Sequence, residues 1–331
     1  MIELVRQLSE TAGPSGREGA VLRRIEDHLL AAGVPVRSSP LSSLHVVDEA
    51  GGATRLLLVA AVDEPGLILS PPDSRGYSRA HRLGNLPAQA YAGRRIRTLT
   101  GASGLVVSVE AATSRRGRPP TILVDLGADA TALEPAEGAF AVLDEAFAGE
   151  AEAWTGKALA DRVGVAILLQ MAAAGIGLSA GCSYAFLVQG QLGLRALNPT
   201  LRALAPSRLI LIRGAREAEA VDASGSAIVR GKGPVLLVRH GPAVSDPRLT
   251  AIAEQAAGET GLPLQRAILL ADPHVSRGGE AGLGRVPALL LAYPVGNAEG
   301  ARQSVSPSDI EQLAPLLGTL ANTVAASASL D

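Results

Sequence analysis

The sequence predicts an α/β protein with a small β-barrel inserted into it. Amphipathic helical patterns alternate with short buried strand patterns towards both ends of the chain. Between about residues 66 and 152 there are only short β-type runs, separated by Gly, Pro and Ser clusters. The length of 331 residues also exceeds the size at which a single core usually stops growing. We therefore predict an α/β domain at 1–65 and 153–331, interrupted by a barrel domain at 66–152.

Composition excludes several classes of function. Apolar residues make up 47% of the chain, the formal net charge is −2, and aromatic residues are only 2%. A nucleic-acid surface needs clustered positive charge and stacking rings, so we expect no nucleic-acid partner. No apolar run approaches membrane-spanning length, and the first residues do not resemble a signal peptide. With Cys182 as the only cysteine, we expect a cytoplasmic protein without disulfides or a thiolate metal cluster.

The first α/β segment begins with two helical patterns. Ser15 and Glu18 have the spacing of a capping box in front of the second helix, which Gly33 ends. Three strand patterns follow, at 34–39, 44–49 and 55–62, and residues 50–55 read as a hairpin-like turn between the last two.

The remaining elements are predicted from the same kinds of pattern. The barrel strands are expected at 66–70, 94–100, 104–109, 121–126 and 138–144, and the basic loop tip Arg115, Arg116 and Arg118 reads as a solvated turn. In the second α/β segment we expect helices at 161–175, at 246–261 and from Pro307, which Ser306 caps. Strands are expected at 184–189, 207–213, 264–272 and 286–294, with a strand–turn–strand at 228–240.

Several blocks carry a resemblance to a known family. They are "AGPSGREGAVLRRI", "RLLLVAAVDEPGLIL", "AGRRIRTLTGASGLVVSV", "GKALADRVGVAILL", "FLVQGQLGLRAL" and "RGKGPVLL". In this order the chain resembles the dinuclear-metal aminopeptidases of the tetrahedral and glutamyl aminopeptidase type, a family that includes proteins described as glucanases. The resemblance implies a zinc-aminopeptidase-like three-layer sandwich with a mixed sheet. It also implies a barrel that serves assembly into dimers or dodecamers.

The resemblance implies two zinc or cobalt ions bridged by a carboxylate, with a second carboxylate as general base. The positions that match the family's ligands and base carry other residues in this chain. They are Ala61, Ala160, Gly190, Gln191, Arg213 and, by a looser match, Ala292. Alanine and glycine cannot coordinate a cation, an amide is a poor ligand, and an arginine repels cations.

Two carboxylates of the family's pattern survive, as Asp63 and Asp161. Because the other ligand positions and the general-base position are lost, we expect no catalytic residue, no metal and no cofactor at this place. Arg213 is expected to occupy the former metal site and to pair with Asp63 or Asp161, replacing the lost positive charge.

The sequence thus predicts a catalytically inactive aminopeptidase homologue with a binding, scaffolding or assembly role. Its expected partners are itself, an active relative, or a peptide or small ligand in the former cleft. The alternative is an active hydrolase that uses metal-free acid–base chemistry or a displaced metal site around Asp272, His274 and Glu280. Ser179, in a G-x-S-x-G pattern, follows a helix and precedes a strand, so we interpret it as a turn. Gly231, Lys232 and Gly233 lack the spacing of a phosphate loop.

Overall fold

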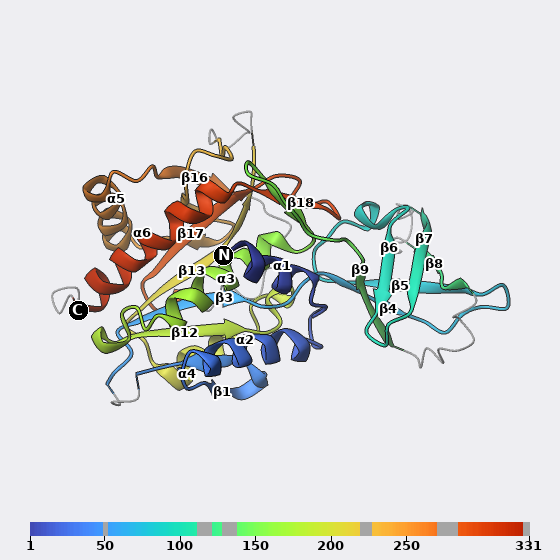
Figure 1. The fold of residues 1–331 in the computed structure, drawn as a ribbon, viewed down its shortest axis with the longest axis horizontal. Coiled ribbons are helices and arrows are strands. Elements are labelled where there is room, and N and C mark those ends of the chain that lie inside the picture. Colours follow the sequence, from blue (N-terminus) through green and yellow to red (C-terminus); the bar gives the residue numbers. More distant parts are fainter. Residues whose placement is uncertain (49–51, 111–120, 128–137, 219–226, 270–283, 327–331) are drawn as a thin grey trace.

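The computed structural model describes residues 1–48, 52–110, 121–127, 138–218, 227–269 and 284–326. Figure 1 shows two parts, an α/β part with all the labelled helices and a barrel at one end of the molecule. The mixed sheet and the closed barrel confirm the predicted fold class. In the described residues, no helix is both long and apolar enough to cross a membrane.

The α/β part is built on one mixed sheet of nine strands. The strand order is β1-β2-β12-β3-β13-β17-β14-β15, and β16 pairs with β14. The neighbours β12, β3, β13 and β17 run parallel to one another, whereas the pairs at either end of this group are antiparallel. The strands are β1 (Arg37–Ser38), β2 (Leu44–Val46), β3 (Leu56–Ala61), β12 (Cys182–Leu187), β13 (Arg208–Arg216), β14 (Val235–His240), β15 (Ala243–Val244), β16 (Gln265–Leu269) and β17 (Ala288–Val295).

Within the segments of the chain that the structure describes, six α-helices accompany the sheet. They are α1 (Ile2–Glu10), α2 (Gly19–Ala31), α3 (Leu159–Ala173), α4 (Leu197–Leu204), α5 (Pro247–Thr260) and α6 (Pro307–Ala326). The largely buried helix α3 packs over β3 and β13, with α1, α2 and α6 against it. The close approach of α3 to strand β13 depends on two glycines, one in each element. A Cβ at Gly164 would lie 3.2 Å from the Ile212 carbonyl oxygen, and one at Gly214 would lie 2.7 Å from the Ala160 Cα.

The barrel closes through the strand order β4-β5-β8-β7-β6-β9, with antiparallel pairs throughout. Its strands are β4 (Gly66–Leu69), β5 (Tyr77–Leu83), β6 (Arg95–Thr98), β7 (Ser103–Glu110), β8 (Thr121–Asp125) and β9 (Ala139–Leu143). A three-stranded sheet of β10 (Ala148–Gly149), β11 (Trp154–Gly156) and β18 (Gln303–Val305) then leads back to the α/β part (Figure 1).

Some local predictions were wrong. Strand β5 was missed, because its inward positions include the small Ser78 and Ala80 instead of large apolar side chains. The hairpin predicted around residues 50–55 does not form, since β2 and β3 both pair with β12 and lie on opposite sides of it. Of the strand–turn–strand predicted at 228–240, only the second half is a strand. Ile228 forms a single bridge with Ala218. The tip Arg115, Arg116 and Arg118 lies outside the described residues.

Candidate functional site

Most of the predicted site positions lie at the carboxyl edge of three parallel strands. Ala61 ends β3 opposite Leu187, which ends β12, and Arg213 lies further along β13 on the other side of β3. In parallel sheets this edge is where ligands and catalytic groups gather. The short 3-10 turn Gly190–Leu192 follows β12 after Val188 and Gln189.

The backbone leading into the site is strained at two places. Gln189, before the turn, and Ala158, before helix α3, both have φ of +56°, in the left-handed region. An ordinary L-residue there costs about 1–2 kcal/mol, and such strain is concentrated at functional sites. The chain therefore keeps the sharp turns of an active-site edge.

The site itself is a cavity of only about 20 Å³, room for roughly one water molecule. It is lined by five of the predicted positions and three apolar side chains, namely Ala61, Asp161, Gly190, Gln191, Arg213, Leu194, Leu211 and Ile212. The structure thus brings most of the predicted positions together.

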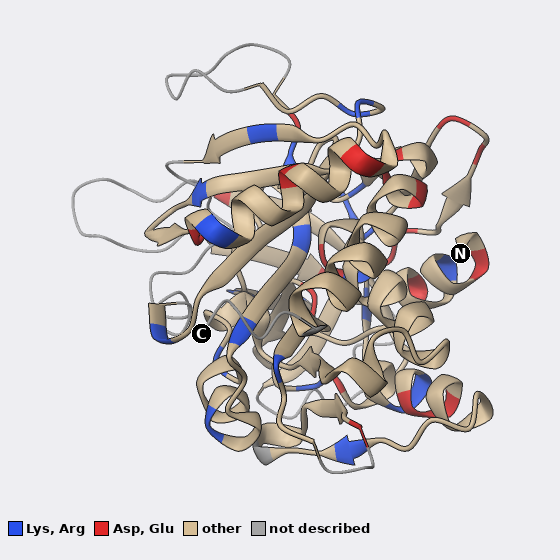
Figure 2. Cartoon of the chain, turned by 90° about the vertical axis from the view of Figure 1, so that its left-hand side faces the viewer, with Lys and Arg blue, Asp and Glu red and all other residues tan. Residues whose placement is uncertain are grey.

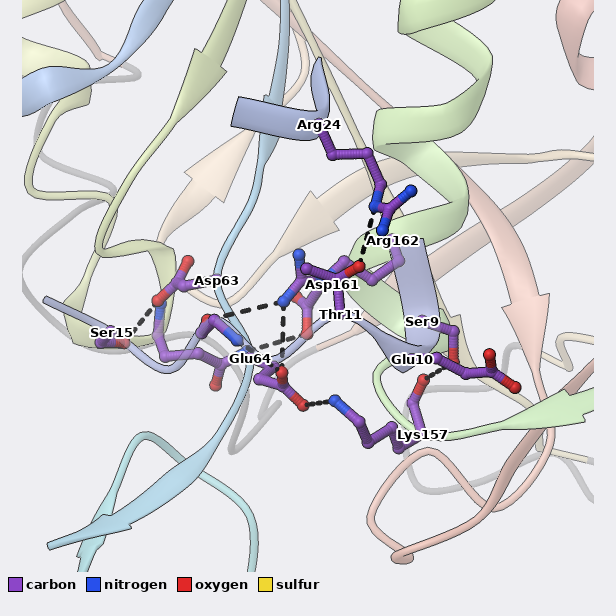
Figure 3. Close-up of polar contacts among 12 residues, drawn as sticks. Ser9, Glu10, Thr11, Ser15, Arg24, Asp63, Glu64, Lys157, Asp161 and Arg162 are labelled. Carbon is purple, nitrogen blue, oxygen red and sulfur yellow. Dashed lines mark hydrogen bonds and ion pairs between the residues drawn. The ribbon is translucent and has the colours of Figure 1, made fainter. Parts of the chain in front are cut away.

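Asp63 is fully buried beside this cavity and acts as an acceptor for the turn. Its carboxylate accepts hydrogen bonds from the N–H groups of Gly190 at 2.7 Å and Gln191 at 2.9 Å. It also accepts one from the Ser15 hydroxyl (Figure 3). Burial raises the pKa of Asp63 to about 6, although these hydrogen bonds act in the opposite direction.

Gly190 fits against Asp63 and Ala61 with no room for a side chain. A Cβ at position 190 would overlap the Cβ of Ala61 and lie 2.8 Å from Asp63 Oδ1. The position at which the resemblance places a general-base glutamate is therefore closed by neighbouring atoms.

Asp161 and Gln191 form the second contact across the site. Gln191 Nε2 donates to Asp161 Oδ2 at 3.0 Å, and Gln191 Oε1 accepts from the Asn85 N–H at 3.5 Å, at the limit of a hydrogen bond. Burial, with the nearby charge of Asp63, raises the pKa of Asp161 to about 7, while the charge of Arg213 opposes the shift. The charge of Arg213 thus favours the ionised form of Asp161, one of its two expected partners.

A buried ion cluster lies under the site. Glu64 accepts from Lys157 Nζ at 2.5 Å, from Arg162 Nη2 at 3.3 Å and from the Gly13 N–H at 2.9 Å (Figure 3). The Glu64, Lys157 and Arg162 side chains are at most 2% exposed. Burial lowers the pKa of Lys157, and the Glu64 charge opposes that shift.

In the view of Figure 2, positively and negatively charged residues are mixed over the described chain.

The predicted capping box is wrong. Helix α2 begins at Gly19, and the Ser15 hydroxyl donates to Asp63 instead of accepting from the first turn. Glu18 Oε1 accepts from the N–H groups of Gly16 at 2.8 Å and Gln189 at 2.9 Å. These side chains therefore hold the site turn instead of the helix end. The prediction missed their role, along with that of Lys157 and Arg162; the one available signal was that Lys157 is one of two lysines in the chain.

Ala160 and Ala292 lie apart from the cavity lining. The Ala160 N–H donates to Gln303 Oε1 at 2.8 Å, and its carbonyl accepts from the Tyr293 hydroxyl at 2.8 Å. Ala292 is fully buried in β17, next to Arg213 in register but within the core. The looser match of Ala292 to a metal-ligand position therefore has no counterpart in the cavity.

The described residues do not fit the two metal ions that the resemblance implies. No group of three or more His, Cys, Asp or Glu side chains in these ranges could hold a metal ion. The cavity offers one carboxylate and one amide, both already hydrogen-bonded to each other, and it also contains a guanidinium. Cations bind where several oxygen or nitrogen donors converge, and an arginine opposes this. No catalytic step can be derived through such a metal here.

The other candidates have structural roles or lie elsewhere. Ser179 lies in a 3-10 turn between α3 and β12, as predicted. The N–H groups of Gly231 and Gly233 donate to the Asp309 carboxylate. These two donors are therefore already used and do not face a phosphate. Burial raises the pKa of the Cys182 thiol to about 12 and lowers that of His45 to about 4. Asp272, His274 and Glu280 lie outside the described residues.

A protein-family profile, M42 glutamyl aminopeptidase, matches residues 43–316, most of the chain. The chain belongs to the M42 glutamyl aminopeptidase family. The resemblance inferred from the sequence blocks is thereby confirmed.

Several solved structures share the fold of this M42 chain. A TET aminopeptidase from Thaumarchaeota archaeon SCGC AB-539-E09 is 21% identical with a TM-score of 0.84, covering 97% of this chain and 95% of that one. The TET1 peptidase of Pyrococcus horikoshii is 20% identical with a TM-score of 0.83, covering 97% and 99%. A Thermotoga maritima protein named endoglucanase is 19% identical with a TM-score of 0.75, covering 97% and 99%.

Proposed function

We propose that this M42 family member is a pseudo-peptidase, which does not hydrolyse peptides through the family's metal pair and acts by binding or assembly. One observation carries the proposal: Gly190 is packed against Ala61 and Asp63 so closely that no side chain fits at the general-base position. A general base must lie within hydrogen-bond reach of the water it activates. A glycine has no group that could do so.

The surrounding charges support the same proposal. Several carboxylates without metals would leave uncompensated charge in a buried site, at a cost of several kcal/mol per ion. Here Asp63 is instead satisfied by three donors, and Asp161 faces Gln191 and the charge of Arg213. The two carboxyl groups of the site thus face hydrogen-bond donors and the Arg213 guanidinium in place of a metal ion.

Assembly is the first of the two roles we propose. The Pyrococcus horikoshii TET1 peptidase can assemble into a tetrahedron or a large octahedral shell. In this chain Leu105 and Val107, on the outer face of β7, are 44% and 45% exposed, and this apolar pair suits burial against a second copy. Light scattering of the purified chain measures this, and a monomer at micromolar concentration would refute self-assembly.

The test of inactivity combines two measurements on the purified full-length chain. Metal content is determined by mass spectrometry, and hydrolysis of aminoacyl p-nitroanilides is followed with added zinc or cobalt. We expect substoichiometric metal and no turnover above the rate without protein. Stoichiometric metal together with turnover would contradict the proposal and favour the displaced site around Asp272, His274 and Glu280.

Restoring the family's pattern gives a sharper version of the test. The variant Ala61→His, Ala160→Asp, Gly190→Glu, Gln191→Glu and Arg213→Asp supplies the missing donors. Because position 190 has no room for a side chain, we expect this variant to lose stability and to bind zinc weakly. Tight zinc binding with gain of hydrolysis would show that the scaffold remains competent.

A further inference from the structure

A larger pocket opens beside the closed cavity. Its volume is about 790 Å³, within the roughly 300–1,000 Å³ typical of ligand sites. Gln191 and Leu194 line both spaces, so the Gln191 side chain forms part of the wall between them. The barrel contributes Arg82, Gly84 and Asn85, and the segment after β12 contributes the rest of the lining. The pocket therefore lies where the two parts of the molecule meet.

The charged side chains lining this pocket are all positive. Arg82 enters from the end of β5 and Arg195 from the segment before α4, and the lining contains no Asp or Glu. Neither guanidinium forms an ion pair with a carboxylate in the part of the chain that the structure describes. Arg82 Nη1 donates to the Leu86 carbonyl at 2.9 Å, which fixes the position of that guanidinium. Two arginines without a counter-charge favour an anion, and their planar forks suit a carboxylate or a phosphate.

Two amides in the pocket wall distinguish between these anions. Asn85 Nδ2, a donor, and Asn198 Oδ1, an acceptor, are buried and without a hydrogen-bond partner among the described residues. Buried polar atoms of this kind are rare and call for an explanation. A rotation about χ2, which is soft for asparagine, exchanges the places of the amide oxygen and nitrogen, so each side chain can present either a donor or an acceptor. Each amide carries both donors and an acceptor, and a peptide, with its carbonyl acceptor and N–H donor, can satisfy both kinds of group, whereas phosphate at neutral pH offers predominantly acceptors.

We propose that this pocket binds the carboxylate of a short peptide, with Arg82 and Arg195 at the carboxylate and the two asparagines at peptide groups. This rests on the ligand-binding role in the former cleft and names its chemistry. The carboxylate has two possible sources, an acidic side chain and the C-terminus of the peptide. Both present the same planar pair of oxygens to the guanidinium groups.

The experiment is isothermal titration of the full chain with three peptides. Ala-Glu-Ala amide carries only a side-chain carboxylate, Ala-Gln-Ala with a free C-terminus carries only a terminal one, and Ala-Gln-Ala amide carries neither. We expect one of the first two to bind about 5- to 10-fold more tightly than the third, as charge-assisted hydrogen bonds are stronger than neutral ones. Equal affinity of all three, absence of binding, or equally tight binding of inorganic phosphate would overturn the proposal.

Variants assign the binding to these residues. Arg82→Gln and Arg195→Gln should each weaken the preferred peptide several-fold, and the double variant should bind it no better than Ala-Gln-Ala amide. Arg79→Gln on β5 and Arg202→Gln on α4 remove exposed arginines outside the pocket and should leave the affinity unchanged. Unchanged affinity in the double variant, with melting curves like those of the parent, would overturn the assignment.

The same samples separate this inference from the pseudo-peptidase proposal. Product analysis after titration shows whether the peptide has been cleaved. Cleavage of a peptide that binds through Arg82 and Arg195 would contradict inactivity and leave the pocket assignment standing. Loss of the carboxylate preference in a chain that cleaves nothing would overturn the pocket assignment alone.

Discussion

The Gly190 N–H donates to Asp63 Oδ1 at 2.7 Å, and the same carboxylate holds Gln191 N–H through its other oxygen. These hydrogen bonds hold the turn Gly190–Leu192 against the segment that follows β3. The resemblance places the general base and a metal ligand in this turn. Because the Ser15 hydroxyl also donates to Asp63, the N-terminal segment is fastened there too. Asp63 is a central structural residue of the site.

The first prediction concerns the closed position 190. Gly190→Ala should lower the free energy of unfolding by about 1–3 kcal/mol, because the added methyl group would overlap Ala61 Cβ and approach Asp63 Oδ1. Urea denaturation followed by circular dichroism measures the change. Adding Ala61→Gly to this variant should recover part of the loss, since it removes one of the two overlaps.

Gly258→Ala is the matched control for this substitution. Gly258 lies in α5, and a Cβ there meets nothing within 4 Å. Alanine in an open helical position should stabilise the protein by about 0.5–1 kcal/mol. A Gly190→Ala variant as stable as the parent would show that the site can open and would weaken the argument for inactivity.

The second prediction concerns pH. The pKa values of Asp63 and Asp161 are raised in the folded protein, to about 6 and about 7, above the usual value of 3.8. The folded state therefore binds more protons than the unfolded state over this range, and the free energy of unfolding decreases as the pH rises. The contribution of this coupled pair is fully present below about pH 4 and is lost by pH 7–8. At about 1.4 kcal/mol per pKa unit, shifts of this size in the pair correspond to several kcal/mol.

Asp161→Asn tests the origin of this pH dependence. The neutral amide cannot ionise, so the decrease in the free energy of unfolding between pH 5 and pH 8 should become shallower than in the parent. Its side-chain oxygen can still accept from Gln191 Nε2. Asp27→Asn, on the exposed face of α2, controls for the removal of a carboxyl group as such. Identical slopes in Asp161→Asn and the parent would assign the pH dependence to other groups.

The sequence was sufficient to predict the central strands of the α/β sheet, because these strands form visible runs of apolar residues. The runs in β3, β12, β13 and β17 are buried along nearly their whole length, so each was visible as an apolar segment. Strand β5 was not visible, since it closes the barrel through backbone pairing with β4 and β8 while presenting small and charged side chains. Pairing of this kind leaves no periodic signal.

The contacts of the site were harder to predict because they join distant parts of the chain. The sequence blocks indicated which positions lie at the strand ends, and Ala61, Asp161, Gly190, Gln191 and Arg213 do line one cavity. The sequence favoured a local role for Ser15, at a helix end, but a carboxylate 48 residues further on accepts its hydroxyl. Local spacing cannot reveal a partner that only the fold brings close.

The third prediction concerns the buried ion cluster. Glu64→Gln should cost about 3–5 kcal/mol, because Lys157 and Arg162 would then be buried without their common anion. Lys157→Met should cost less, as Glu64 keeps Arg162 and the Gly13 N–H. Chemical denaturation of both variants gives the comparison. The double variant should be more stable than Glu64→Gln alone, and the reverse order of the single variants would contradict this account of the cluster.

The last prediction concerns the removal and addition of metal. A metal bound at 100 times its Kd adds about 2.7 kcal/mol to stability, which corresponds to a rise in Tm of several degrees for a chain of this size. Since the described residues contain no group that could hold a metal ion, we expect the Tm to be the same in EDTA and in excess zinc or cobalt. Magnesium chloride at equal ionic strength controls for salt effects. A rise in Tm with zinc that Asp272→Asn, His274→Ala or Glu280→Gln abolishes would place a metal site at those residues and would reopen metal-dependent hydrolysis as the function.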